Sequence, residues 1–282
     1  MKLLRYGPKG AEKPGLLDEQ GGVRDLSAYV DDIAGEVLTP EGLARLAGLD
    51  VSSLPRVEGT PQESLRLGPC VGRSGKFIAI GLNFADHAAE TGAEIPSEPV
   101  VFNKWISCIS GPDDDIQLPR GSVKSDWEVE LGVVIGKPAL YVSEEDAMSH
   151  VAGYCVVNDV SEREWQLERG LTWDKGKGFD TFGPIGPWLV TADEVDPGDL
   201  HMWLEVNGKR FQDGSTKTMI FGVAKLISYL SGLMSLQPGD IITTGTPPGV
   251  GLGQTPPVYL KAGDTVKLGI AGLGEQTQKV RV

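Results

Sequence analysis

Cysteine, histidine and long apolar runs are all scarce in this chain of 282 residues. The three cysteines, Cys70, Cys108 and Cys155, show no C-x-x-C spacing, which excludes a disulfide framework and a zinc pattern and favours small core residues. No stretch reaches the roughly 18 apolar residues that a membrane-spanning helix requires. Residues 1–10 are polar and interrupted by Pro8, unlike a secretory signal. We therefore expect a cytoplasmic protein with no membrane partner.

Positive charge is also in short supply. The chain has 26 Lys and Arg against 39 Asp and Glu, a formal net charge of −13. Nucleic acids need a basic patch, so this balance argues against such a partner. A small anionic substrate is still possible, because a bound metal can reverse the local field. The 38 glycines and 19 prolines favour turns and short strands over helices, and we expect a mostly β fold of the α+β class.

Two units are predicted, a small N-terminal α+β domain over residues 1–70 and a catalytic domain over residues 71–282. The first contains a strand at its start, a hairpin around Gly21 and Gly22, and a short helix with Thr39 as its N-cap. Its residues do not indicate any chemistry.

The clearest strand signal is the acidic-then-apolar run over residues 126–136. Alternate side chains of a strand share a face, so Glu128 and Glu130 project together. If this strand end enters the core, the two carboxylates need a cation, a basic side chain or water to offset their repulsion. If it faces solvent, the pair carries no function.

A short helix is expected over residues 83–92, with Asn83 as its N-cap and Gly92 as its stop. His87 and Glu90 stand three residues apart and share one helical face. A carboxylate beside an imidazole fixes its orientation, which is what a general base requires. A surface ion pair is the alternative.

The apolar strand over residues 153–160 carries Asp159 near its end, where it could supply a third carboxylate to a metal. Asp159 could instead cap the helix expected over residues 161–170. That helix already has Ser161 and Glu164 as a capping box, which favours the ligand interpretation.

Three further segments complete the pattern. Arg163 and Gln166 would share one face of the expected helix and could hold a carboxylate. The Gly-rich stretch over residues 175–184 contains two lysines and by default is a solvated loop. Residues 216–233 have the apolar spacing of a long helix packed on the core.

Several of these features occur in one order. They are Gly81-Leu82-Asn83-Phe84-Ala85-Asp86-His87, Glu128-Val129-Glu130-Leu131, Asn158-Asp159-Val160, Gly176-Lys177-Gly178-Phe179-Asp180-Thr181 and Thr244-Gly245-Thr246-Pro247. Over residues 71–282 this order resembles the fumarylacetoacetate hydrolase family. The resemblance implies a mixed β-sandwich roll, usually a homodimer. The start of the chain also resembles a bacterial subgroup assigned to 2,4-diketo-3-deoxy-L-rhamnonate or -fuconate hydrolysis and often labelled ureidoglycolate lyase.

The resemblance also implies a divalent metal, commonly Mg²⁺, held by Glu128, Glu130 and Asp159. Oxygen-only ligands suit Mg²⁺, Mn²⁺ or Ca²⁺ better than zinc. The family's catalytic histidine–glutamate pair corresponds to His87 and Glu90.

By the same resemblance the family's loop lysine corresponds to Lys177, and its substrate contacts correspond to Arg163, Gln166 and Thr246. The implied reaction is hydrolysis of a C–C bond in a 2,4-diketo acid, giving pyruvate and a hydroxy acid such as lactate. Oxaloacetate decarboxylation and ureidoglycolate lyase chemistry are alternatives in the same site. A non-catalytic, metal-stabilised binding protein is the alternative from another class.

Overall fold

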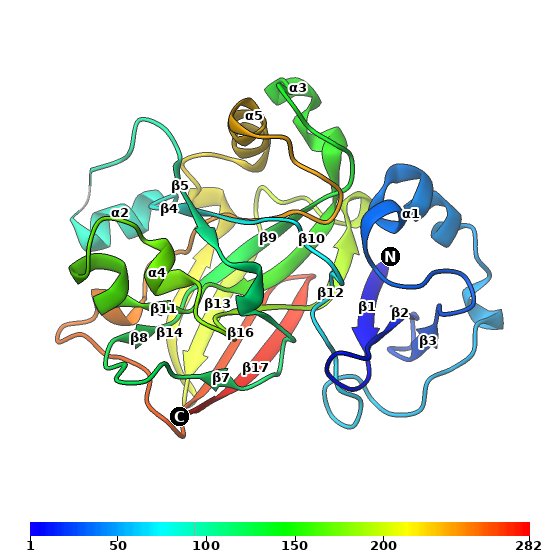
Figure 1. Cartoon of the computed structure of the whole chain (residues 1–282), viewed down its shortest axis with the longest axis horizontal. Helices are drawn as coiled ribbons and strands as arrows, with labels where there is room; N and C mark the ends of the chain where they lie inside the picture. Colours follow the sequence, from blue (N-terminus) through cyan, green and yellow to red (C-terminus); the bar gives the residue numbers. More distant parts are fainter. Residues whose placement is uncertain (93) are drawn as a thin grey trace.

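The computed structural model describes residues 1–92 and 94–282, and its architecture is two main sheets with few helices (Figure 1). The larger, ten-stranded sheet has the order β3-β2-β1-β12-β10-β9-β15-β4-β5, with β6 beside β12. Its strands are β1 (Lys2–Tyr6), β2 (Lys13–Leu17), β3 (Val23–Asp25), β4 (Phe77–Gly81), β5 (Val100–Lys104), β6 (Ile109–Ser110), β9 (Val129–Ile135), β10 (Val151–Asn158), β12 (Gly183–Thr191) and β15 (Ile241–Thr243).

A five-stranded sheet of order β14-β13-β16-β17-β7 and a two-stranded pair complete the β structure. The five strands are β7 (Ile116–Gln117), β13 (His201–Val206), β14 (Lys209–Ser215), β16 (Thr265–Ile270) and β17 (Gly274–Arg281). The pair consists of β8 (Ser125–Asp126) and β11 (Ser161–Glu162). The expected mostly β, α+β fold is confirmed.

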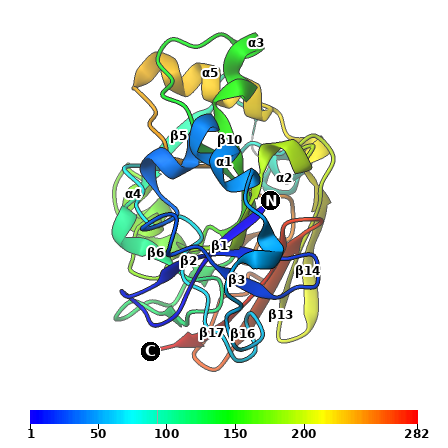
Figure 2. The same ribbon diagram turned by 90° about the vertical axis from the view of Figure 1, so that its right-hand side faces the viewer.

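The α-helices are short. They are α1 (Pro40–Ala47), α2 (Ala85–Thr91), α3 (Glu144–Ala147), α4 (Asp174–Lys177) and α5 (Val223–Leu233). Helices α3 and α5 lie together at one end of the molecule in both views (Figures 1 and 2). Among the described residues, no helix combines the length and the apolar character needed to span a bilayer.

The N-terminal stretch joins the larger sheet directly, because β1 pairs antiparallel with β12. The predicted hairpin forms between β2 and β3, and the predicted cap of α1 is present, with the Thr39 hydroxyl accepting a bond from the Gly42 amide. Figure 2 looks onto strands β1, β2 and β3, and α1 lies above them in this view. The division at residue 70 stays a prediction.

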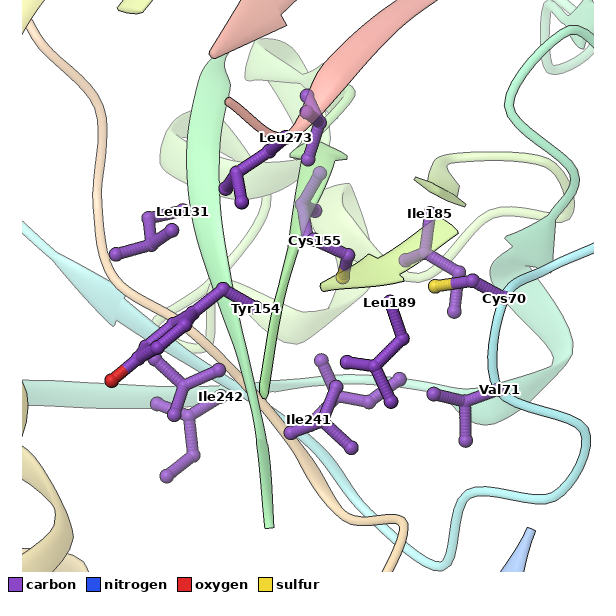
Figure 3. Packing of buried hydrophobic residues seen from close by; sticks show 14 of the residues in the cluster. Cys70, Val71, Leu131, Tyr154, Cys155, Ile185, Leu189, Ile241, Ile242 and Leu273 are labelled. Atoms are coloured by element: carbon purple, nitrogen blue, oxygen red, sulfur yellow. The ribbon is translucent and has the colours of Figure 1, made fainter. Parts of the chain in front are cut away.

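The core lies where β9, β10, β12 and β15 stack their apolar side chains (Figure 3). Every residue of β9 is buried, Glu130 and Gly132 included, and its Val, Leu and Ile content predicts this burial. Cys70 and Cys155 point into this cluster near Leu189, and all three cysteines are free and buried. Their predicted role as core residues is confirmed.

The helix predicted over residues 216–233 starts too early, since α5 begins at Val223. The reason is Asn83. Its backbone carbonyl accepts from the Ile220 amide, and its side chain bonds the Phe221 amide and carbonyl. These bonds hold residues 219–221 outside the helix, in an isolated bridge followed by a bend. The prediction that Asn83 caps α2 is wrong for the same reason, because its side chain is engaged there.

The helix predicted over residues 161–170 is also wrong in part. Ser161 belongs to β11 and donates to the Asp159 carbonyl instead of capping a helix, and one π-helical turn spans Glu164–Glu168. The Gly-rich stretch is not wholly loop, because it overlaps α4. A Cβ on Gly176 would lie 2.5 Å from the Gln166 amide nitrogen and 2.5 Å from the Glu162 carbonyl oxygen, so only glycine permits this packing.

Candidate functional site

The site forms where four strands of the larger sheet meet at one edge. β9 starts there, while β4, β10 and β15 end there, because β9 pairs antiparallel with β10 and β15, and β15 pairs parallel with β4. The register sets Asn158 opposite Val129. The Asp159 amide then donates to the Glu128 carbonyl over 2.9 Å. Strand pairing alone therefore brings Asp159 beside the two glutamates.

Glu128, Glu130 and Asp159 are all buried, and each offers an oxygen within 4.8 Å of the others. Among the described residues, this is the group of acidic and metal-ligating side chains whose geometry could hold a cation. Three buried carboxylate oxygens are a donor set suited to a hard divalent ion.

Two buried lysines neutralise part of this charge. The Lys177 ammonium lies 2.7 Å from Glu128 Oε2 and 2.8 Å from Asp159 Oδ2. The Lys104 ammonium donates to the other oxygen, Asp159 Oδ1, over 2.6 Å and to the Lys177 carbonyl over 2.5 Å. Lys104 thus fixes both the carboxylate and the backbone that presents Lys177.

Arg163 forms a second buried ionic contact. Its guanidinium contacts Asp126 Oδ2 at 2.8 Å and Glu128 Oε1 at 2.7 Å. Asp126 also accepts the Gly251 and Leu252 amides, so it ties the loop after β15 to the carboxylate cluster.

The pKa directions follow from this uneven pairing. Burial alone would raise the pKa of Glu128, but the charges of Lys177 and Arg163 outweigh it and lower that pKa. Burial and repulsion from Asp159 and Glu128 raise the pKa of Glu130 well above its ordinary value. Glu130 is held by the Thr243 hydroxyl and the Gly245 amide, which are neutral donors. It is the carboxylate with the strongest need for an added cation.

The predicted histidine–glutamate pair is present on α2, with His87 Nδ1 and Glu90 Oε2 3.0 Å apart. Glu90 also accepts the Gly249 amide over 3.0 Å, which anchors α2 to the loop after β15. His87 is buried and lines the same cavity as Glu128 and Glu130. The surface-pair alternative does not describe this arrangement.

The three residues predicted to contact substrate also line this cavity. Gln166 Oε1 accepts from Arg163 over 2.9 Å, so the two side chains act together. The Thr246 hydroxyl donates to the Val129 carbonyl and accepts from Gln212 Nε2. Its single proton is therefore committed, and a substrate contact of Thr246 stays a prediction.

The cavity has a volume of about 210 Å³ and combines a charged floor with apolar walls. The floor comprises Glu128, Glu130, Arg163 and Lys177. The walls comprise Ile80, Leu82, Phe102, Leu167, Trp173, Val250 and Leu252. This volume lies below the range of about 300–1,000 Å³ that is usual for drug-sized ligands, so the site suits a small molecule.

Lys104 and Asp126 are two residues of the site that were not predicted from the sequence. Both had a signal in the alternation of strand side chains. Lys104 lies two residues after the buried Phe102 on β5, and Asp126 lies two residues before Glu128. A lysine on the inward face of an apolar strand needs a buried carboxylate partner, and the acidic partners were already known from the sequence.

The fold and this acidic cluster define a class of β-rich proteins with a candidate divalent-metal site at a sheet edge. The family model described as the fumarylacetoacetate (FAA) hydrolase C-terminal matches residues 76–281. The chain belongs to the fumarylacetoacetate hydrolase family. Proteins of Burkholderia multivorans and Burkholderia cenocepacia, whose names class them provisionally as hydrolases, are 68% and 67% identical over 100% of this chain and 99% of their own length.

Solved structures agree with this assignment. Fumarylacetoacetate hydrolase from Exiguobacterium antarcticum superposes with a TM-score of 0.86 at 34% identity, covering 100% of this chain and 99% of that one. Maleylpyruvate hydrolase from Sphingobium sp. SYK-6, in complex with manganese(II) and pyruvate, gives 0.81 at 30% identity with the same coverage. A 2-hydroxyhepta-2,4-diene-1,7-dioate isomerase from Mycobacterium marinum gives 0.75 at 32% identity, covering 100% and 98%.

Proposed function

We propose that this protein hydrolyses the C–C bond between carbons 3 and 4 of a 2,4-diketo acid, releasing pyruvate and a second carboxylic acid. The observation that supports this most is that Glu128, Glu130, His87 and Lys177 line one small cavity, with Asp159 completing the carboxylate cluster beside Lys177 and Glu90 bonded to His87. A structural ion would need the carboxylates but not the other three residues. A similar chain, maleylpyruvate hydrolase, binds manganese and pyruvate.

The residues divide the work as follows. When bound, a divalent ion, Mg²⁺ or else Mn²⁺ or Ca²⁺, would be held by Glu128, Glu130 and Asp159 and would supply Lewis-acid polarisation of the keto-acid oxygens. Arg163 and Gln166, coupled at 2.9 Å, orient the substrate carboxylate above this floor.

His87 acts as the general base. Its Nδ1 is directed to Glu90, which orients the imidazole to take a proton from water. The water oxygen bonds to carbon 4, the bond between carbons 3 and 4 breaks, and its electron pair forms the enolate of pyruvate. The Lys177 ammonium stabilises that negative charge, and the proton held by His87 returns to carbon 3.

The particular substrate we propose is a 2,4-diketo-3-deoxy sugar acid with a short acyl end, such as 2,4-diketo-3-deoxy-L-rhamnonate or -fuconate. Its hydrolysis gives pyruvate and lactate. The small cavity supports a substrate of this size. We further propose that the protein works as a cytoplasmic homodimer, which size-exclusion chromatography with light scattering tests.

The decisive experiment measures pyruvate release from acetylpyruvate and from the diketo sugar acid by chelator-treated protein, before and after Mg²⁺ is restored. We expect turnover only with the metal. Absence of pyruvate from either substrate under both conditions contradicts the proposal.

A matched pair of variants distinguishes this reaction from the alternatives. His87→Ala should slow hydrolysis by about 10²–10⁴-fold, whereas metal-assisted decarboxylation of oxaloacetate needs no attacking water and should survive. His201→Ala is the control, because His201 is exposed on β13 and pairs with Asp213 away from the cavity. If the protein is instead a non-catalytic binding protein, Glu128→Gln would lower the melting temperature, and neither the parent nor the variant would show turnover.

A further inference from the structure

The walls of the cavity differ sharply from its floor. Five of the apolar side chains that line the cavity form what we call the apolar wall: Leu82, Phe102, Trp173, Val250 and Leu252. Leu82, Val250 and Leu252 lie on loops that leave β4 and β15, and Trp173 immediately precedes α4. The carboxylates lie at the ends of strands within the sheet. A substrate whose acidic end reaches the floor must therefore place its other end against this wall.

The wall begins directly beside the charged floor. The Lys177 ammonium lies 5.2 Å from the centre of the Phe102 ring, and the Phe102 ring packs edge-on against Trp173 at 5.4 Å. A Cβ on Gly81 would lie 2.3 Å from a ring carbon of Trp173, so the missing side chain at Gly81 is what admits the indole here. The tryptophan is thus fixed in place by two neighbours.

Leu82 is held in the wall at a conformational cost. Its φ is +51°, in the left-handed region that a bulky residue rarely adopts. Such strain persists only where the surrounding structure imposes it, and it is concentrated at ligand sites. The two ends of the segment explain it, because Gly81 must contact Trp173 and Asn83 must bond residues 220 and 221.

The cations available in the cavity decide which chemical groups can lie against the wall. Among the described residues that line the cavity, the permanent cations are Arg163 and Lys177. Arg163 already contacts Asp126 and Glu128, and Lys177 already contacts Glu128 and Asp159. A second carboxylate on the far end of a substrate would lie against Leu82, Trp173 and Leu252, where it would lose hydration without gaining a partner.

This inference rests on the function proposed above: we infer that the acyl end of the substrate is short and uncharged and ends in a carbon group. The apolar wall then selects against a substrate with a distal carboxylate. This separates the chain from relatives of similar fold whose names give a dioate or maleylpyruvate as substrate. Trp173 and Leu82 are the specificity-determining residues.

The test compares two acids that differ only in the distal group. 2-Oxopentanoate and 2-oxoglutarate have the same length and the same 2-oxo acid head, and only the second has a distal carboxylate. Titration calorimetry on the Mn²⁺-loaded protein should give at least about tenfold tighter binding of 2-oxopentanoate. Equal or tighter binding of 2-oxoglutarate overturns the inference.

Two variants locate the effect. Leu252→Lys adds a cation to the wall and should reduce the preference for 2-oxopentanoate over 2-oxoglutarate at least about tenfold. Leu171→Lys is the control, because Leu171 is fully exposed and outside the cavity, and it should leave this preference unchanged. Leu82→Gly suits the positive φ, so it should fold as well as the parent while weakening 2-oxopentanoate binding more than pyruvate binding. Unchanged preferences in both wall variants overturn the inference.

The two proposals fail separately. If acetylpyruvate and butanoylpyruvate release pyruvate but maleylpyruvate is hydrolysed equally well, the wall inference is overturned and the proposed hydrolysis stands. If no diketo acid is hydrolysed while 2-oxopentanoate still binds preferentially, the proposed hydrolysis falls and the selectivity of the wall is supported.

Discussion

Lys104→Met is the substitution from which the structure predicts the largest effect outside the reacting groups. The Lys104 ammonium is fully buried and lies 2.6 Å from Asp159 Oδ1. Methionine keeps most of the length and apolar volume of the side chain but removes the charge. Asp159 then retains only Lys177 as a charged partner, while the Lys177 carbonyl loses a donor at 2.5 Å.

Removing one member of a buried ion pair usually costs about 3–5 kcal/mol, because the other charge stays buried. Lys177 still serves the second oxygen of Asp159, so we take the lower end, about 3 kcal/mol. At roughly 2–4 °C per kcal/mol for a domain of this size, the melting temperature should fall by roughly 6–12 °C.

Differential scanning fluorimetry in a chelator measures this loss without any contribution from a bound ion. Lys225→Met is the matched control, since Lys225 on α5 is exposed and pairs with the exposed Glu144. Its removal should leave the melting temperature unchanged within error, because exposed pairs contribute little. A Lys104→Met protein as stable as Lys225→Met would refute the assignment of Lys104 as a buried counterion.

Three further outcomes follow from the same contacts. Glu130→Gln should abolish measurable Mn²⁺ binding in calorimetry while raising the melting temperature in chelator, because it removes the least compensated buried carboxylate. His87→Ala should lower kcat of pyruvate release by about 10²–10⁴ while binding of 2-oxopentanoate survives; loss of both would contradict a base role. Burial raises the pKa of Asp114, but bonds from Arg66 and the Gly111 amide outweigh it and lower that pKa overall. The ionised carboxylate therefore stabilises the folded protein at pH values above the ordinary pKa of 3.8, and this stabilisation is lost as the pH falls through the folded-state pKa. Asp114→Asn should therefore be less stable than the parent at pH 7, and the gap in a pH series of thermal melts should close in acid.

Much of the site could be predicted from the sequence because strand periodicity is a local property. The alternation of Glu128 and Glu130 and the apolar run after them predict a strand with two carboxylates on one face, while leaving their burial open; β9 is that strand, and Glu128 directly precedes it. That Asp159 joins them depends on the pairing of β9 with β10, a contact between segments about 30 residues apart in sequence. The place of Asp159 at the end of an apolar strand makes it a candidate ligand, and the family resemblance groups it with the two glutamates.

The errors have a common physical cause. Asn83 and Ser161 are good helix caps by local preference, but in the fold their side chains bond distant or non-helical backbone groups. The same applies to Lys177, which local composition places in a solvated loop. Its burial depends on Glu128, which directly precedes β9, and Asp159, which directly follows β10. Sequence periodicity therefore predicts least well the positions of polar side chains whose partners are distant in the sequence.

Lys177 contacts the same oxygens that a metal would use, and this leads to a further prediction. Its ammonium contacts Glu128 Oε2 and Asp159 Oδ2. The other oxygen of Glu128 contacts Arg163, and the other oxygen of Asp159 contacts Lys104.

A bound dication must therefore share Glu128 and Asp159 with a like charge. Lys177→Met removes that repulsion, so Mn²⁺ should bind at least about tenfold more tightly by calorimetry, even as pyruvate release is lost. If Lys177 instead organised the ligands, the same substitution would weaken Mn²⁺ binding. Tighter metal binding with lost turnover would mean that Lys177 lowers metal affinity in order to place a positive charge where the enolate forms.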